Sequence, residues 1–93
     1  MMTRFQPIEK EEIKSLHFPS TDVLEKRADQ IQRQSELNRA MSLGNLEHGK
    51  IRIYFEDAES KKMVETTVWA LTDNRVVLKQ GIGIPINRIY RSS

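Results

Sequence analysis

The chain has 93 residues, with 15 Lys and Arg, 13 Asp and Glu and no cysteine, and its formal charge is +2. This length suits one small domain, and the lack of cysteine excludes disulfide scaffolds, thiol nucleophiles and cysteine-based zinc sites. Hydrophobic residues make up 38% and charged residues 30%, so we expect a folded chain. No apolar run approaches the ~20 residues of a membrane helix. We therefore expect a cytoplasmic protein with no membrane contact.

Residues 1–19 are expected to form an N-terminal arm ahead of a single domain at 20–93. Pro7 and Pro19 bracket a short polar piece, and Pro7 suits the first turn of a short helix. Four apolar residues of this piece are candidates to anchor it: Ile8, Ile13, Leu16 and Phe18.

A long helix is predicted at about 21–43. Ser20, Thr21 or Asp22 can cap its start, and Asp22 and Glu25 have a spacing like that of a capping box. Gly44 followed by Asn45 provides a left-handed stop. The apolar residues of this segment form two stripes on different sides of the helix. One stripe contains Leu24, Ala28 and Ile31, and the other contains Leu37, Ala40 and Met41.

The stripe of Leu37, Ala40 and Met41 predicts a surface for another protein or a second copy of this chain. Two stripes on a helix about 33 Å long exceed what one face of a tiny sheet covers. The alternative is intramolecular, with the arm folding back over the second stripe. The sequence leaves both possibilities open.

Residues 49–91 change to the alternating pattern of β-strands. From Ile51 to Phe55, apolar and polar residues alternate, which predicts a strand with one buried face. After a polar turn at 57–60, the stretch 61–72 is rich in β-branched and aromatic residues. Its inward face stays open between two sets of residues, and a bulge or strong bend would use both. These sets are Met63, Trp69 and Leu71, and Val64, Val68 and Ala70.

Trp69 has two interpretations. A tryptophan in a β-branched strand is usually core, with its N–H bonded to a backbone carbonyl, and this is our expectation. An exposed Trp69 would instead favour a protein partner, because tryptophan is common among binding hot spots.

The rest of the chain predicts short strands joined by tight turns. Asp73 and Asn74 tolerate a positive φ and form the next turn, and Gln80–Gly81 forms another. Pro85 donates no ladder hydrogen bond, so it ends a strand or lies at an edge. The prediction is an α+β fold, with the arm and one long helix packed on a bent antiparallel sheet of four to five short strands.

This order of elements resembles the Sm-like and SH3-like small barrels. The ending Ile84–Ile89 is similar to the short helical turn before the last strand of an SH3-like barrel, and Leu71–Leu78 is loosely similar to a strand-turn-strand of Sm-like chains. That likeness implies that Asp73 and Asn74 help to hold a base. More closely, the stretch from Val64 through Ile89 resembles a group of small bacterial proteins of uncharacterised function, and it implies no activity.

No pattern in the chain is typical of catalysis, and we expect no enzyme, no cofactor, no metal and no small-molecule substrate. His17 and His48 lie in or beside predicted turns without a second ligand at a fixed spacing. Gly81 and Gly83 precede Ile84 and Pro85 instead of a helix, so they do not form a dinucleotide motif.

Two functions remain. The leading hypothesis is a non-enzymatic module that binds a protein or itself. The alternative is binding of RNA or single-stranded nucleic acid, because residues 49–93 carry 8 basic and 5 acidic side chains and basic residues alternate with tyrosines. The candidate residues for nucleic-acid binding are Lys50, Arg52, Tyr54, Asp73, Asn74, Arg75, Lys79, Arg88 and Tyr90.

Overall fold

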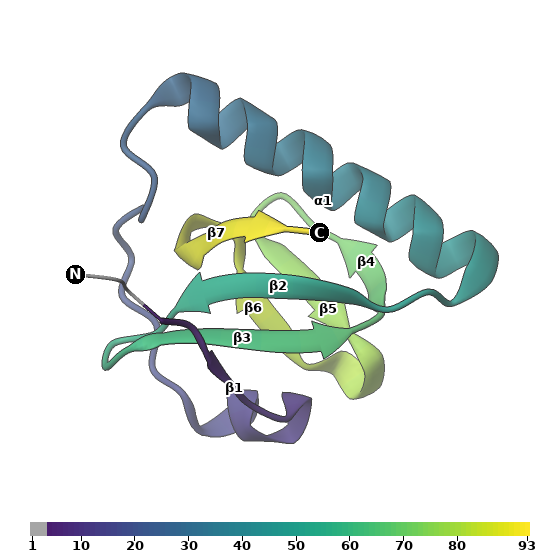
Figure 1. The fold of residues 1–93 in the computed structure, drawn as a ribbon, viewed down its shortest axis with the longest axis horizontal. Helices are drawn as coiled ribbons and strands as arrows, with labels where there is room; N and C mark the ends of the chain where they lie inside the picture. Colours follow the sequence, from purple (N-terminus) through teal and green to yellow (C-terminus); the bar gives the residue numbers. More distant parts are fainter. Residues whose placement is uncertain (1–3) are drawn as a thin grey trace.

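The computed structural model describes residues 4–93, which form one long helix and two small sheets (Figure 1). The elements are β1 (Gln6–Pro7), the 3-10 helix η1 (Lys10–Ser15), α1 (Arg27–Glu47), β2 (Ile51–Glu56), β3 (Lys61–Thr66), β4 (Val68–Leu71), β5 (Arg75–Leu78), η2 (Lys79–Gly81), β6 (Gly83–Pro85), η3 (Ile86–Arg88) and β7 (Ile89–Ser92). One sheet has the strand order β1-β3-β2-β7, and the other has the order β4-β5-β6. The predicted α+β class, with a helix packed on short strands, is confirmed.

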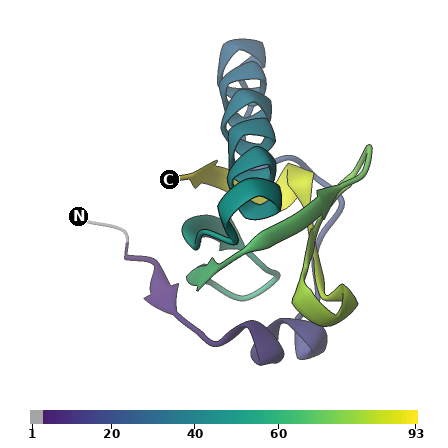
Figure 2. The same ribbon diagram turned by 90° about the vertical axis from the view of Figure 1, so that its right-hand side faces the viewer.

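The core lies between the two sheets and beneath α1. Ile53 and Phe55 of β2 and Val64 of β3 are fully or almost fully buried, as the alternation in the sequence predicts. The other sheet adds Val76 and Leu78 of β5 to the same cluster. Seen from the side, α1 lies on one side of the sheets and η1 on the opposite side (Figure 2).

The start of α1 differs from the prediction. The helix begins at Arg27 instead of residue 21, and the Asp22 side chain does not cap it. The Asp22 carboxylate instead accepts hydrogen bonds from both terminal nitrogens of Arg33, at 2.8 and 2.9 Å, and from the N–H of Leu24 at 2.8 Å. A contact with a side chain eleven positions away cannot be read from local spacing, and it ties the segment before Arg27 to the helix.

The end of α1 is also later than predicted. Gly44 lies inside the helix, which continues to Glu47 and ends with His48 in the left-handed conformation at φ 54°. A Cβ atom on Gly44 would lie 2.1 Å from the carbonyl oxygen of Val68. Glycine is therefore needed because the helix backbone touches β4, and it does not act as a stop.

The long stretch predicted at 61–72 is divided into two strands that belong to different sheets. The chain bends at Thr67, between β3 and β4, and the pairing of β4 with β5 shifts register between Val68 and Ala70. Val64 and Val68 therefore point inward before the shift, and Leu71 packs against the core after it. The predicted bend or bulge is confirmed.

The first and last strands of the domain are neighbours. β2 pairs with β3 and also with β7, and η3 forms the helical turn that the sequence predicts just before the last strand. The arm returns along β3, where β1 pairs in parallel, and Ile13 of η1 is buried. Because η1 and α1 lie on opposite sides (Figure 2), the arm does not cover the helix.

Candidate functional site

Four segments of the chain meet around Trp69 in a hollow of about 470 Å³. The strand β4 carries Trp69, η1 carries Lys10, β2 follows Lys50, and η2 begins with Lys79. We call this hollow the tryptophan groove. Its complete lining is Lys10, His48, Lys50, Glu65, Thr66, Thr67, Trp69 and Lys79.

Trp69 is half exposed, at 45%, so the expectation that it lies in the core is wrong. Its neighbour Val68 is completely buried, and successive side chains of a strand point to opposite faces. Trp69 also lies within the register shift between Val68 and Ala70. The indole therefore faces outward from β4 and is partly exposed to solvent.

The end of α1 supports the indole from one side. The left-handed turn at His48 brings its imidazole ring to 5.7 Å from the Trp69 ring, centroid to centroid. The hydroxyl of Thr67 donates to the carbonyl oxygen of His48 at 3.3 Å, which ties the bend of the sheet to the helix end.

The groove is predominantly basic. Three lysines and one glutamate line it, and within residues 4–93 neither Lys50 nor Lys79 forms an ion pair. Lys10 lies 3.8 Å from Glu11, in an exposed pair of little strength. Lys50 and Lys79, which the sequence indicated as candidates, thus share one site. Lys10 was missed, and an exposed Trp69 was considered only as a contact for a protein partner.

The outer face of the four-stranded sheet carries two of the predicted residues, Tyr54 and Tyr90, in an aromatic group. Phe5 meets Tyr54 and Tyr90 edge to face, with ring centroids 5.1 and 5.6 Å apart. The guanidinium of Arg91 lies 4.5 Å from the Tyr54 centroid, and the ammonium of Lys61 lies 5.1 Å from the Tyr90 centroid. We call these five residues the tyrosine cluster. Phe5 and Lys61 had no signal in the sequence pattern because their contacts depend on the path of the arm.

Tyr90 is further fixed by its hydroxyl, which donates to the carboxylate of Glu56. Burial, together with this carboxylate, raises the pKa of Tyr90 to about 12. The phenol is therefore neutral at ordinary pH, and its ring is held beside Phe5.

The sequence predicted Arg88 as a surface residue that binds nucleic acid, but Arg88 is buried. Its side chain donates to the carbonyl oxygens of Glu56, at 3.0 Å, and Thr21, at 2.9 Å. These bonds tie η3 to β2 and to the segment before α1. Arg88 is a structural residue because its donors are committed inside the fold.

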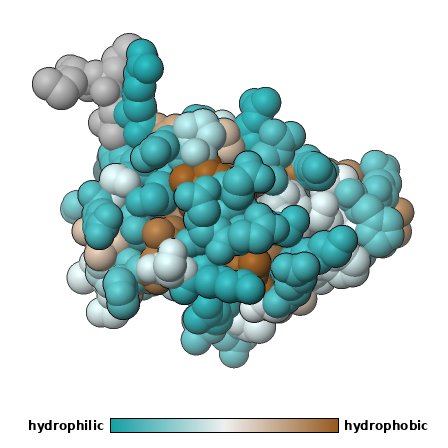
Figure 3. All heavy atoms as spheres, turned by 90° about the horizontal axis from the view of Figure 1, so that it is seen from below, coloured by the Kyte–Doolittle hydropathy of each residue, from teal (hydrophilic) through white to brown (hydrophobic). Residues whose placement is uncertain are grey.

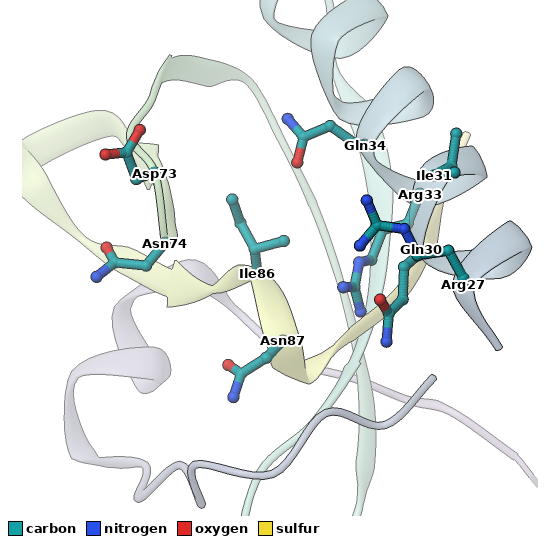
Figure 4. A pocket seen from close by; sticks show the side chains of 9 residues that line it. All are labelled: Arg27, Gln30, Ile31, Arg33, Gln34, Asp73, Asn74, Ile86 and Asn87. Carbon is teal, nitrogen blue, oxygen red and sulfur yellow. The ribbon is translucent and has the colours of Figure 1, made fainter. Parts of the chain in front are cut away.

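Asp73 and Asn74 lie in a separate hollow between α1 and the turn from β4 to β5 (Figure 4). This helix–turn groove has a volume of about 420 Å³ and shares no residue with the tryptophan groove. Arg75 lies beside the same turn and donates to the carbonyl oxygen of Gly83 at 3.2 Å. Besides Asp73 and Asn74, the helix–turn groove is lined by Arg27, Gln30, Ile31, Arg33, Gln34, Ile86 and Asn87.

The helix stripe predicted as a protein interface is engaged inside the chain. Leu37 is 0% exposed and Ala40 is 5% exposed, and Met41 packs against the same core. The structure therefore gives Leu37 and Ala40 a core role, and the expected interface does not lie on them. Ile31, from the other stripe, is 59% exposed.

Residues 4–93 contain no group of three or more His, Asp or Glu side chains placed to hold a metal ion. Among the helices of these residues, none combines the length and the apolar character that crossing a membrane requires. Comparison with protein-family models, with curated proteins and with solved structures finds no match for this chain.

Proposed function

We propose that the protein is a non-catalytic binding module that holds single-stranded nucleic acid in the tryptophan groove. The observation that carries the proposal is the half-exposed Trp69 with Lys10, Lys50 and Lys79 around it. Such sites combine an aromatic platform, on which a base stacks, with cations that follow the phosphates. A base within a duplex is already stacked, so an indole at the surface of a groove suits a single strand.

The composition of the groove favours nucleic acid over a protein partner. Lysine is depleted at the centre of protein interfaces, whereas three lysines line this groove. The face opposite α1 is predominantly hydrophilic, with small, separated hydrophobic areas (Figure 3). The apolar stripe that made protein binding the leading hypothesis is used in the core through Leu37 and Ala40.

The arrangement of the strands adds support by analogy alone. In the Sm-like and SH3-like barrels that the sequence resembles, a bent meander closes onto its first strand after a short helical turn. Here β2 pairs with β7, and η3 lies just before β7. Folds of this kind serve many functions, so the proposal depends on the groove.

The test uses the fluorescence of Trp69, which is the only tryptophan of the chain. A mixed-sequence RNA of about 12 nucleotides is added at about 50 and about 200 mM salt, and affinity is also followed by anisotropy of a labelled strand. We expect quenching of Trp69 on binding. With three phosphate contacts, affinity should be about 20-fold weaker at the higher salt.

Variants locate the site. We expect Trp69→Ala to weaken binding at least fivefold, since stacking contributes about 1–3 kcal/mol per base. Lys50→Gln should weaken binding and lower the salt dependence by about one counterion. The matched control is Lys26→Gln, which removes the same charge from an exposed residue outside the groove.

Two outcomes would overturn the proposal. One is equal loss in Lys50→Gln and Lys26→Gln, which would indicate an effect of net charge alone. The other is absence of Trp69 quenching at low salt.

A further inference from the structure

The tyrosine cluster is a binding arrangement that is already filled by the chain itself. Phe5 stands edge-on between the rings of Tyr54 and Tyr90, with interplanar angles of 76° and 73°. Arg91 lies on one of these rings and Lys61 beside the other. Two aromatic rings with adjacent cations are what a nucleobase and its phosphate require.

The outward residues of β2 lead from the tryptophan groove towards this cluster, past Glu65 of β3, which lies opposite Arg52. Lys50, Arg52 and Tyr54 occupy alternate positions, so they share the outward face, while Ile51 and Ile53 are buried. Lys50 lines the tryptophan groove. From Lys50 to Tyr54 the strand β2 advances about 13 Å.

The arm that carries Phe5 is weakly attached at this point. β1 consists of Gln6 and Pro7, which are both exposed. Pro7 has no N–H to donate, and the next backbone bond along the arm is from the N–H of Ile8 to the carbonyl oxygen of Met63, at 2.9 Å. A segment with few buried contacts and few backbone bonds opens at low cost.

We propose that Tyr54 and Tyr90 form a second base-binding subsite, which Phe5 occupies in the free protein. This inference rests on the proposed function and extends the same site. A strand bound at Trp69 that is long enough to reach Tyr54 displaces Phe5, and a base takes the place of the phenyl ring. Phe5 therefore acts as an internal competitor that lowers the affinity for long strands and leaves that for short strands unchanged.

The test compares two lengths of RNA. An oligomer of about 3 nucleotides fills the tryptophan groove alone, and one of about 8 nucleotides reaches the tyrosine cluster. We expect Phe5→Ala to bind the long oligomer about fivefold more tightly than the wild type and the short one equally well. The control is Gln6→Ala, which changes an exposed neighbour in the same arm. The variant with both Phe5→Ala and Tyr54→Ala should lose the gain.

Separate outcomes test the inference and the proposed function. If Trp69 binds the short oligomer but Phe5→Ala has no effect on the long one, or weakens it, the second subsite is wrong and the groove stands. If neither oligomer binds to the wild type or to Phe5→Ala, both proposals fail. In the absence of RNA, the NMR resonances of the Tyr54 and Tyr90 rings should shift in Phe5→Ala, and unchanged resonances would also contradict the inference.

Discussion

The ion pair between Asp22 and Arg33 gives the sharpest test of what holds α1 in place. The side chain of Arg33 is 6% exposed and that of Asp22 is 28% exposed. One terminal nitrogen of Arg33 also donates to the carbonyl oxygen of Ile89 at 3.0 Å. The pair thus joins the segment before α1, the helix itself and β7, and Asp22→Asn is the substitution that removes its negative charge with the least change of shape.

We expect Asp22→Asn to lower the free energy of unfolding by about 3 kcal/mol. Removing one partner of a buried pair costs about 3–5 kcal/mol, and the partial exposure of Asp22 places this pair at the lower end. Urea unfolding at neutral pH, followed by circular dichroism, measures the loss. The variants Asp22→Asn and Arg33→Met and the double variant form a double-mutant cycle. We expect a coupling free energy of about 2 kcal/mol between the two side chains. A loss below about 0.5 kcal/mol, or simple additivity, would refute the reasoning.

The same pair makes stability dependent on pH. The hydrogen bond from Arg33 lowers the pKa of Asp22 from its ordinary value of 3.8, so on acidification the unfolded chain takes up a proton before the folded protein does. The contribution of this ion pair to stability is complete above the pKa that Asp22 has in the unfolded chain. It is lost as the pH falls towards the pKa of Asp22 in the folded protein. We expect this loss in the wild type below about pH 4, and a smaller one in Asp22→Asn.

Part of the acid sensitivity should remain in that variant because of Asp57. Burial raises the pKa of Asp57, but hydrogen bonds from Lys62 and from the N–H groups of Ser60 and Glu59 outweigh it, and the net shift is downward. The ammonium of Lys62 lies 2.8 Å from the Asp57 carboxylate. If Asp22→Asn lost no stability at all on acidification, this assignment to Asp57 would be contradicted.

Two more predictions concern single contacts. Gly44→Ala should destabilise the protein by about 2 kcal/mol, because the overlap with the Val68 carbonyl outweighs the better helix propensity of alanine; in thermal unfolding, the exposed control Ser42→Ala should be nearly neutral, and a stabilised Gly44→Ala would contradict the close approach. In an alkaline absorbance titration, Tyr90 should ionise at about pH 12. Glu56→Gln should bring this ionisation to lower pH, and an unchanged titration would mean that the carboxylate has no part in it.

The strands were largely predictable, because the patterns that mark them are local. The alternation from Ile51 to Phe55 identifies β2 and its buried face, and the expected turn before the last strand is η3. The helix limits were not, because both depend on distant partners. Asp22 has the spacing of a cap but pairs with Arg33, and Gly44 has the position of a stop but touches β4.

The candidate site was predictable in part, for a related reason. Lys50 and Lys79 are exposed, as polar residues flanking strands should be. Trp69 was expected in the core because a tryptophan in a β-branched strand is usually buried, and the apolar residues on both faces of 61–72 left the inward face open. The bend at Thr67 and the register shift after Val68 decide which face is inward, and both arise from how the two sheets pair. A one-residue change of register turns the following side chains to the other face, and the two-faced apolar pattern at 61–72 does not locate where that change occurs.

The helix also closes one edge of the four-stranded sheet, which limits how the protein can assemble. On the free side of β7, Arg33 donates to the carbonyl oxygen of Ile89, and the carboxylate of Glu36 accepts from the N–H of Ser92 at 3.0 Å. An open edge is where another chain adds a strand. A strand added at β7 would have to displace both side chains from these backbone groups. Arg33 would then lose its hydrogen bond to Ile89. A ligand on the outer face of this sheet, by contrast, leaves these bonds intact.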